Sequence, residues 1–505
     1  MTGRPRPRTI LFLISDTGAG HRSAANALTA AMKLVDEQAA SAGASTAHGR
    51  ATQRRDTNWR TVIVDGFAEC ANFPLRKGVF LYGPAIKHSP RLYSQLFHLT
   101  NTVNRFNAAY RLSQPFLRQG MAQLLLRYRP DVIVSVHPLL NHITLQVMRD
   151  LGARVPFITV ITDLVTVHTA WVAPSVTACV VPTEAARDFA IARGLARKRV
   201  RLLGMPIDPK FAAPPQGEPR ERKLALGLDP DRPAILLVGG GEGAGGLAQA
   251  VYALGALALD AQMIVVTGRN RALRADLERA KERFRTPTRI LGFVDNMPEL
   301  MAASDMVVTK AGPGSISEAM ACGLPLILTG YIPGQEEGNV DYVRANNLGI
   351  FADSTEKLVA SVRQLLDPND PRLLEMRANV QRLSKPRASF DIGRLILSYV
   401  PPAGAPSIWE TIPRARRGRI TTALDRRRRW AVRRARRFAN TSVGRAQRIR
   451  ALTPLSPFSQ TLVTWRRSSA HPQRRLGLPT LNGARALLLR GAVATRRARR
   501  LGERA

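Results

Sequence analysis

The sequence predicts an α/β protein with two doubly wound domains that face each other across a cleft, followed by a basic tail. The chain has 505 residues, which is too long for a single hydrophobic core. Short apolar runs alternate with helical stretches up to about residue 400, and this alternation indicates parallel sheets covered by helices. Arginine is then concentrated in the last hundred residues. We therefore expect domains at 1–205 and 206–400 and a tail at 401–505.

Nine short apolar runs are expected to be buried strands. They cover residues 10–15, 61–65, 131–135, 157–162 and 178–181 in the first half, and 234–239, 263–267, 306–309 and 325–329 in the second. The join is expected at 204–219, where glycine, proline and aspartate cluster. Residues 39–58 are rich in small side chains and are expected to form a mobile loop. We expect the last helix before residue 400 to pack back on the first domain.

Cysteine content and hydropathy exclude several classes of protein. Cys70, Cys179 and Cys322 are far apart and show no disulfide or zinc spacing, so we expect core thiols in a reducing cytosol. The apolar run 9–14 is far shorter than a signal peptide and is expected to be the first strand. No run approaches the ~20 apolar residues of a spanning helix, so membrane contact would be peripheral.

The charge is concentrated in the tail. Residues 401–505 contain 26 arginines, no lysine and three acidic residues, which gives +23 of the total +38. The helix-compatible segment 424–439 places Trp430 and Phe438 among arginine clusters, a pattern typical of a helix lying on an anionic membrane. Two alternatives stay open for the tail. It could be a solvated, largely disordered extension, or it could neutralise nucleic-acid phosphates.

Two glycine-rich turns each follow an expected strand. The first, 15–25, opens a helix and contains Gly20 and His21, so that His21 would project into the cleft. A Gly-x-Gly turn alone is weak evidence, because many such turns need glycine for geometry. The second, 238–246, suits a close approach of the backbone to an anion, although no Gly-Lys-Ser/Thr follows as a P-loop would require.

A third turn is the most informative feature of the chain. The stretch 308–318 reads as a strand end, a glycine turn and a helix start, and a polar loop follows at 331–339. Backbone N–H groups and the positive end of the helix can hold a diphosphate there without a metal. The order of these elements predicts a nucleotide-sugar pocket.

Five motifs in the expected order carry a family resemblance. They are DTGAGHRSAANAL (16–28), ITDLVTVHTAW (161–171), GGGEG (239–243), GFVDNMPELM (292–301) and TKAGPGSISEAMACGLPLILTGYIPGQEEGN (309–339). With them, residues 9–400 resemble the monogalactosyldiacylglycerol synthases and the bacterial diacylglycerol glucosyltransferases. The resemblance implies a GT-B fold of two Rossmann-like domains, a UDP-hexose donor and a diacylglycerol acceptor on a membrane surface. The arginine-rich tail is not part of the pattern.

The resemblance also implies roles for individual residues. His21 matches the general base, and an imidazole is suited to take the proton of an acceptor hydroxyl near neutral pH. Attack on the anomeric carbon opposite the UDP would invert its configuration. The expected donor-side residues are Gly240, Gly241, Glu242, Gly243, Phe293, Val294, Lys310, Gly312, Pro313, Gly314, Ser315, Ile316, Glu318, Gln335, Glu336 and Asn339. The expected acceptor-side residues are Gly20, Asp163 and Trp171, with His168 in the same segment.

The donor-side residues are expected to contact different parts of the UDP-sugar. Phe293 and Val294 are expected near the uracil, Glu318 at the ribose, and Gln335 with Glu336 at the sugar hydroxyls. The turn 312–316 would stabilise the departing UDP in place of a metal. We expect no metal and no cofactor, because the one Asp-x-Asp pattern, 229–231, lies in a proline-flanked linker.

Residues 73–111 combine aromatic and basic side chains and are expected to dock on an anionic membrane, with helical core packing as the alternative. The expected location is cytoplasmic, peripheral on the inner face of the cell membrane. Other functions that fit the same fold are an N-acetylglucosaminyltransferase for another lipid-linked acceptor and a UDP-sugar epimerase. A function in nucleic-acid binding, which is the less favoured prediction, would rest on the tail alone.

Overall fold

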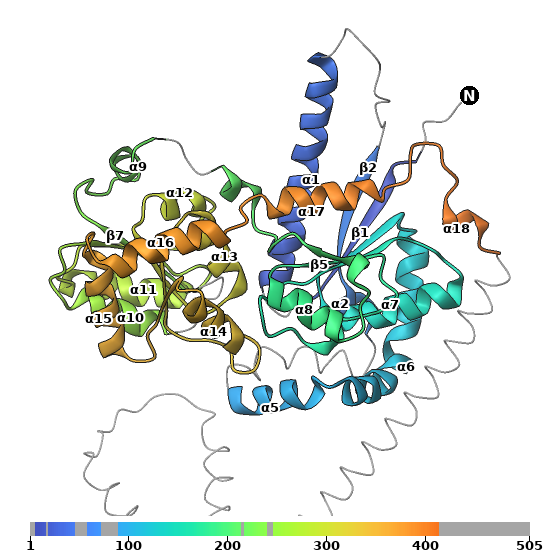
Figure 1. Ribbon diagram of the computed structural model, residues 1–505, viewed down its shortest axis with the longest axis horizontal. Coiled ribbons are helices and arrows are strands. Elements are labelled where there is room, and N and C mark those ends of the chain that lie inside the picture. The colour runs from blue at the N-terminus through green and yellow to red at the C-terminus, as the bar shows by residue number, and fades with distance from the viewer. Residues whose placement is uncertain are drawn as a thin grey trace, which may run out of the picture. The chain divides into compact units, whose positions relative to one another are not determined.

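A computed structural model describes residues 6–16, 19–45, 58–71, 89–213, 217–239 and 246–413 (Figure 1). All of them lie in one compact unit, Met1–Ala435. The helices among these residues include none that is both long enough and apolar enough to cross a membrane. The expected interfacial segment 424–439 lies outside the described residues.

The first half of the chain forms a six-stranded parallel sheet in the order β2-β1-β3-β4-β5-β6. Its inner strand β1 reads RTILFLI and is buried along its whole length, as is typical of a strand covered on both faces. The strands are β1 (Arg8–Ile14), β2 (Trp59–Asp65), β3 (Val132–Ser135), β4 (Phe157–Val160), β5 (Ala178–Val181) and β6 (Val200–Leu202).

The second half forms another six-stranded parallel sheet, in the order β12-β11-β10-β7-β8-β9. The strands are β7 (Ala234–Val238), β8 (Gln262–Val266), β9 (Thr288–Leu291), β10 (Met306–Thr309), β11 (Leu326–Leu328) and β12 (Gly349–Phe351). Both sheets are doubly wound. The chain reverses its direction of travel between β1 and β3 in the first sheet and between β7 and β10 in the second, and ligands bind at such switch points, beyond the carboxyl ends of the strands.

Helices connect the strands in both halves (Figure 1). In the first half they are α1 (Ala19–Ser45), α2 (Gly66–Cys70), α5 (Pro90–Thr100), α6 (Val103–Tyr128), α7 (Pro138–Leu151) and α8 (Glu184–Ala192), with the 3-10 turns η1 (Thr169–Trp171), η2 (Arg197–Arg199) and η3 (Pro209–Ala212). In the second half they are α9 (Pro219–Ala225), α10 (Leu247–Gly255), α11 (Arg271–Ala280), α12 (Met297–Ala302), α13 (Pro313–Ala321), α14 (Glu337–Ala345), α15 (Thr355–Leu366) and α16 (Pro371–Leu383), with η4 (Lys281–Arg283). Two more, α17 (Ala388–Ser398) and α18 (Ile408–Thr411), end the described chain.

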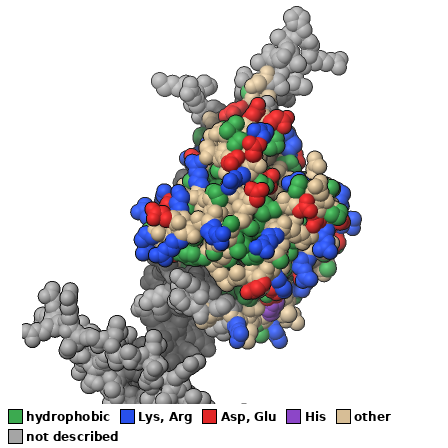
Figure 2. Space-filling model, turned by 90° about the vertical axis from the view of Figure 1, so that its left-hand side faces the viewer, with side chains coloured by type: hydrophobic (Ala, Val, Ile, Leu, Met, Phe, Trp, Pro, Cys, Tyr) green, Lys and Arg blue, Asp and Glu red, His purple; other side chains and the backbone are tan. Residues whose placement is uncertain are grey.

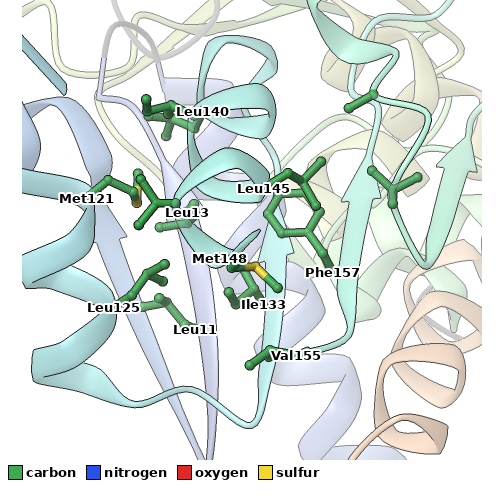
Figure 3. Close-up of a cluster of buried hydrophobic side chains, with 14 of the residues drawn as sticks. Leu11, Leu13, Met121, Leu125, Ile133, Leu140, Leu145, Met148, Val155 and Phe157 are labelled. Carbon is green, nitrogen blue, oxygen red and sulfur yellow. The ribbon is translucent and has the colours of Figure 1, made fainter. Parts of the chain in front are cut away.

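Each sheet is sandwiched between apolar clusters. Figure 3 shows one of them, where side chains of β1, β3 and β4 meet those of α6 and α7. Cys70 and Cys179 are each 1% exposed, which confirms that they are core residues, and burial raises the pKa of the Cys179 thiol to about 12. On the surface, Figure 2 shows Lys and Arg side chains interspersed with Asp and Glu on the side of the second sheet, a mixture typical of a solvated face.

The nine expected strands are all present, with ends shifted by at most two residues. The sequence prediction missed β6, β9 and β12, which are three of the four edge strands of the two sheets. It was also wrong for residues 39–45, expected to be a loop, because α1 continues to Ser45 through an alanine-rich stretch that favours helix.

The chain returns to the first sheet after residue 384. Helix α17 packs against α1, and Ile392 and Ile396 enter the core beneath β1. Trp409 is 1% exposed, and its indole N–H donates to the Pro130 carbonyl at 2.7 Å. The boundary predicted at residue 401 is therefore wrong by about a dozen residues, because these apolar side chains continue the folded core through Ile412.

Candidate active site

The switch point of the first sheet is occupied by two histidines. His21 lies in the first turn of α1, just after β1, and His137 follows β3. Their rings meet edge to face with centroids 4.8 Å apart, and the Phe67 ring also packs edge to face on His137, with centroids 5.5 Å apart. Nδ1 of His137 is buried without a hydrogen-bond partner among the described residues. The geometry thus brings the predicted base to the place where a doubly wound sheet binds ligands.

His21 is held in a mostly apolar setting. Its Nδ1 lies 3.5 Å from the Thr162 hydroxyl, and the ring also hydrogen-bonds to the backbone carbonyl of Val136. Burial lowers the pKa of His21 to about 4, although the Val136 carbonyl and the charge of Asp16 partly oppose this. The imidazole is therefore neutral at pH 7 and can accept a proton.

Trp171 lies beside His21, and both Trp171 and its partner Asp163 are buried. The Trp171 ring is 6.5 Å from the His21 ring and 1% exposed, and its indole N–H donates to Asp163 at 2.6 Å. The indole is therefore a core side chain, and its expected place on the acceptor side stays a prediction. Burial raises the pKa of Asp163 to about 6, while hydrogen bonds from Trp171 and Gln335 oppose the shift.

At the second switch point, the turn after β10 enters α13. Gly312 N–H already donates to Lys310 O at 2.7 Å, and Ile316 N–H donates to Gly312 O at 3.0 Å. Pro313 has no N–H. Of the backbone N–H groups expected to donate hydrogen bonds to a phosphate across 312–316, those of Gly314 and Ser315 are left. Both residues lie in the first turn of the helix, where an N–H group has no acceptor within the helix. No atom of the described residues lies within 4 Å of the place where a Cβ on Gly314 would stand, so a ligand could approach there.

The loop at 331–339, called the donor loop below, is fixed by three side chains. Lys310 forms an ion pair with Glu336, which also accepts a hydrogen bond from Ile332 N–H at 2.9 Å. Asn339 is 2% exposed and donates to the Ala311 carbonyl at 2.9 Å. Lys310 thus bends over the turn instead of pointing into solvent, and Glu336, which is buried, orders the donor loop.

The remaining donor-side residues lie at the rim of the second sheet. The Phe293 ring is 66% exposed, with the Arg269 guanidinium 5.3 Å from its centroid, while Val294 is partly buried in the core beside it. Burial, and then the Asp208 carboxylate, raises the pKa of Glu318 to about 7. An exposed aromatic face suits stacking on a base, and a partly buried acid suits hydrogen bonds to a ribose.

Gly240, Gly241, Glu242 and Gly243 lie outside the described residues. Among those described, no three His, Cys, Asp or Glu side chains come together as metal ligands would. Gly20, by contrast, has no other described atom within 4 Å of the place where a Cβ would stand, in the first turn of α1.

The sequence prediction did not include His137, and it placed Tyr93 only in the docking segment 73–111. His137 could have been found, since it follows an expected strand next to β1. The contact of Tyr93 with Gln335 could not have been found from the sequence, because the two residues are 242 positions apart. In this contact the Tyr93 hydroxyl donates to Gln335 at 2.9 Å.

Comparisons with known proteins show the family of the chain. Residues 21–207 match the family model for monogalactosyldiacylglycerol synthase, and residues 234–390 match the C-terminal domain of glycosyltransferase family 28. Monogalactosyldiacylglycerol synthase 3 of Arabidopsis thaliana is 36% identical over 399 residues, covering 77% of this chain and 81% of that protein. A probable monogalactosyldiacylglycerol synthase of Glycine max is 35% identical over 396 residues, covering 77% of this chain and 70% of that protein. The chain belongs to the monogalactosyldiacylglycerol synthase family.

Membership of the monogalactosyldiacylglycerol synthase family, together with the two doubly wound sheets, gives the chain the GT-B fold and makes it a hexosyltransferase that acts on diacylglycerol. Solved structures with a similar arrangement include MurG of Acinetobacter baumannii, with a TM-score of 0.46 and 14% identity, covering 78% of this chain and all of that one. Anabaena HepE in complex with UDP and glucose has a TM-score of 0.44 and 15% identity, covering 77% of this chain and all of that one.

Proposed function

We propose that the chain transfers galactose from UDP-galactose to the free hydroxyl of diacylglycerol, with inversion, at the surface of an anionic membrane. The observation that carries the proposal is a row of contacts from the base to the donor loop. His21 lies beside Trp171, Trp171 donates to Asp163, and Asp163 bonds to Gln335. The residue expected to contact the sugar is thereby tied to the segment that packs against the base.

In this mechanism the neutral His21 removes the proton of the acceptor hydroxyl. The hydroxyl oxygen then forms a bond to the anomeric carbon as the bond from that carbon to the UDP oxygen breaks. The negative charge that develops on the diphosphate is stabilised by the N–H groups of Gly314 and Ser315 and by the positive end of α13. The proton remains on His21 until it passes to solvent. These residues supply the charge stabilisation without a metal.

The lipid is expected to meet the enzyme at α5 and α6. Four large apolar side chains there are 45–76% exposed, namely Leu96, Leu99, Val103 and Leu112. Arg91, Arg105 and Arg111 are exposed on the same two helices. Apolar side chains in the interface with arginines at its edge are typical of peripheral binding to anionic lipid. Phe106 is buried against His142 and so does not belong to this exposed surface, while residues 73–88 of the expected docking segment lie outside the described residues. We place the enzyme on the inner face of the cell membrane.

A transfer assay tests the proposal. Purified protein is given labelled UDP-galactose or UDP-glucose with diacylglycerol in anionic vesicles and excess EDTA. We expect monogalactosyldiacylglycerol, faster than the glucose product, and with inverted configuration. If the glucose product forms faster than the galactose product, the preferred donor is UDP-glucose. Activity that needs an added divalent cation would refute the metal-free mechanism. The absence of any glycolipid would refute the proposed acceptor.

A further inference from the structure

Helix α5 packs directly on the donor loop. Gly334 has a φ of +84°, which favours glycine, and a Cβ at this position would lie 3.2 Å from the Ser94 Cα, so the loop approaches the helix closely. Nε2 of His98 lies 3.8 Å from the Glu337 carboxylate. The loop expected to contact the hexose thus takes part of its shape from a helix of the other half of the chain.

Tyr93 makes the central polar contact between them. Its hydroxyl donates to Oε1 of Gln335 at 2.9 Å, and the Gln335 side chain also hydrogen-bonds to Asp163. A primary amide has two donor hydrogens and an oxygen that accepts two hydrogen bonds. An amide anchored in this way has a fixed plane, so its direction toward a sugar hydroxyl is set before the donor binds.

The helix that carries Tyr93 is itself anchored. At its carboxyl end, the Thr100 hydroxyl lies 3.2 Å from His168, and the Asn101 side chain accepts a hydrogen bond from Thr169 N–H at 2.7 Å. The Phe97 ring packs edge to face on His168 at 5.1 Å. A hydroxyl presented from a helix held in this way is placed more precisely than one on an unsupported loop.

We propose that Tyr93 is a positioning residue for Gln335, and that its hydroxyl thereby sets how tightly the enzyme binds the hexose of the donor. The inference rests on the proposed function, in which Gln335 contacts the sugar. Tyr93 itself need not touch the substrate. Its contribution should appear in the affinity for the sugar part of UDP-galactose and not in the affinity for UDP.

The test is the variant Tyr93→Phe, which removes one hydroxyl and keeps the ring. Binding of UDP and of UDP-galactose is measured by calorimetry on the full-length protein without acceptor. We expect the affinity for UDP-galactose to fall by about five- to tenfold, the effect of one lost neutral hydrogen bond, and the affinity for UDP to stay within twofold. Tyr110→Phe is the matched control. That hydroxyl donates to the His142 carbonyl at 3.1 Å and does not contact the donor loop, so both affinities should be unchanged.

A double-mutant cycle separates positioning from a general structural effect. In a Gln335→Ala background, Tyr93→Phe should have no further effect on UDP-galactose binding, because no amide remains to be positioned. Three results would overturn the inference: an unchanged affinity in Tyr93→Phe, an equal loss for UDP and UDP-galactose, or the same loss in the Gln335→Ala background. Because no acceptor is present, a failure of the proposed diacylglycerol transfer would leave this result unaffected and would be recognised separately.

Discussion

Replacing His21 by alanine tests the proposed base directly. A positioned general base contributes about 10²- to 10⁴-fold to a proton-transfer step, so we expect kcat/KM for galactose transfer to fall within that range. UDP binding should stay within twofold of the wild type, because the expected diphosphate contacts come from α13 of the second sheet. Calorimetry with UDP and the vesicle transfer assay measure the two quantities on the same preparation.

The pH profile gives a sharper form of the same prediction. A base must be neutral to act, and burial lowers the pKa of His21 to about 4. We therefore expect kcat/KM of the wild type to be constant from about pH 8 to about pH 5 and to fall by about tenfold per pH unit below about pH 4. An ordinary solvated histidine would give this decline near pH 6.5 instead.

Acid also destabilises the fold, and this unfolding must be distinguished from the decline in kcat/KM. His21, His142 and His168 all have a pKa lowered by burial to about 4. The unfolded chain therefore binds more protons than the native chain between about pH 6.5 and 4, and the free energy of unfolding falls as the pH is lowered through this window. Each such histidine contributes up to about 1.4 kcal/mol per pH unit. Unfolding is followed at each pH, and rates are compared only where the protein is folded.

His142→Ala is the matched control for His21→Ala. It also removes a buried imidazole with a lowered pKa, but one that packs on Phe106 and Tyr110 away from the proposed reaction centre. It should lower the melting temperature and leave kcat/KM within a few-fold of the wild type. The assignment of His21 is refuted if His21→Ala transfers galactose at the wild-type rate, or if the acid decline of the wild type persists unchanged in that variant.

Three further predictions concern the donor loop, the membrane and the end of the folded chain. Lys310→Met should lower the free energy of unfolding by about 2 kcal/mol, as measured by urea denaturation, because it leaves the Glu336 carboxylate buried and unpaired. Leu96→Ser with Leu99→Ser should lower binding to anionic vesicles about tenfold in a sedimentation assay, because two exposed apolar side chains are lost from the interface. Trp409→Ala should cost about 3 to 5 kcal/mol of stability, since it empties a fully buried site.

Each of these three predictions has its own control. Adding Glu336→Gln to Lys310→Met removes the unpaired charge and should restore most of the stability; no recovery would show that the ion pair is not the cause. Leu374→Ser removes an equally exposed leucine, 56%, from α16 of the second half and should not change vesicle binding; equal losses would remove α5 from the docking surface. A Trp409→Phe variant that is as unstable as Trp409→Ala would mean that the indole hydrogen bond to Pro130 matters more than packing.

The sequence predicted the central strands well because both of their faces are buried. A strand such as β7, AILLV, is then a continuous apolar run that composition alone can find. The three missed strands are edge strands with mixed burial, for example VRL in β6 and TRIL in β9. Half of such a strand faces water, so no apolar run distinguishes it from a loop.

For the site, local patterns predicted positions but not contacts. The turn before α13 was located from its glycines, whereas the choice of Gly314 and Ser315 as phosphate donors required the hydrogen bonds of Gly312 and Ile316. Trp171 matched a family motif, and only its burial shows that the ring belongs to the core. A motif fixes which residues follow one another, but not what packs on them from another part of the chain.

The donor loop shows why those long-range contacts matter for function. Its residues belong to the second sheet, yet three of its contacts come from the first half: Tyr93 on Gln335, Asp163 on the same amide, and the Thr166 hydroxyl, which accepts from Gly338 N–H at 3.0 Å. The backbone donors expected to hold the diphosphate, by contrast, lie wholly within the second half. UDP recognition can therefore be a property of one sheet with its helices, whereas hexose recognition needs both halves in contact. Any loosening of that contact should weaken sugar selection before it weakens nucleotide binding.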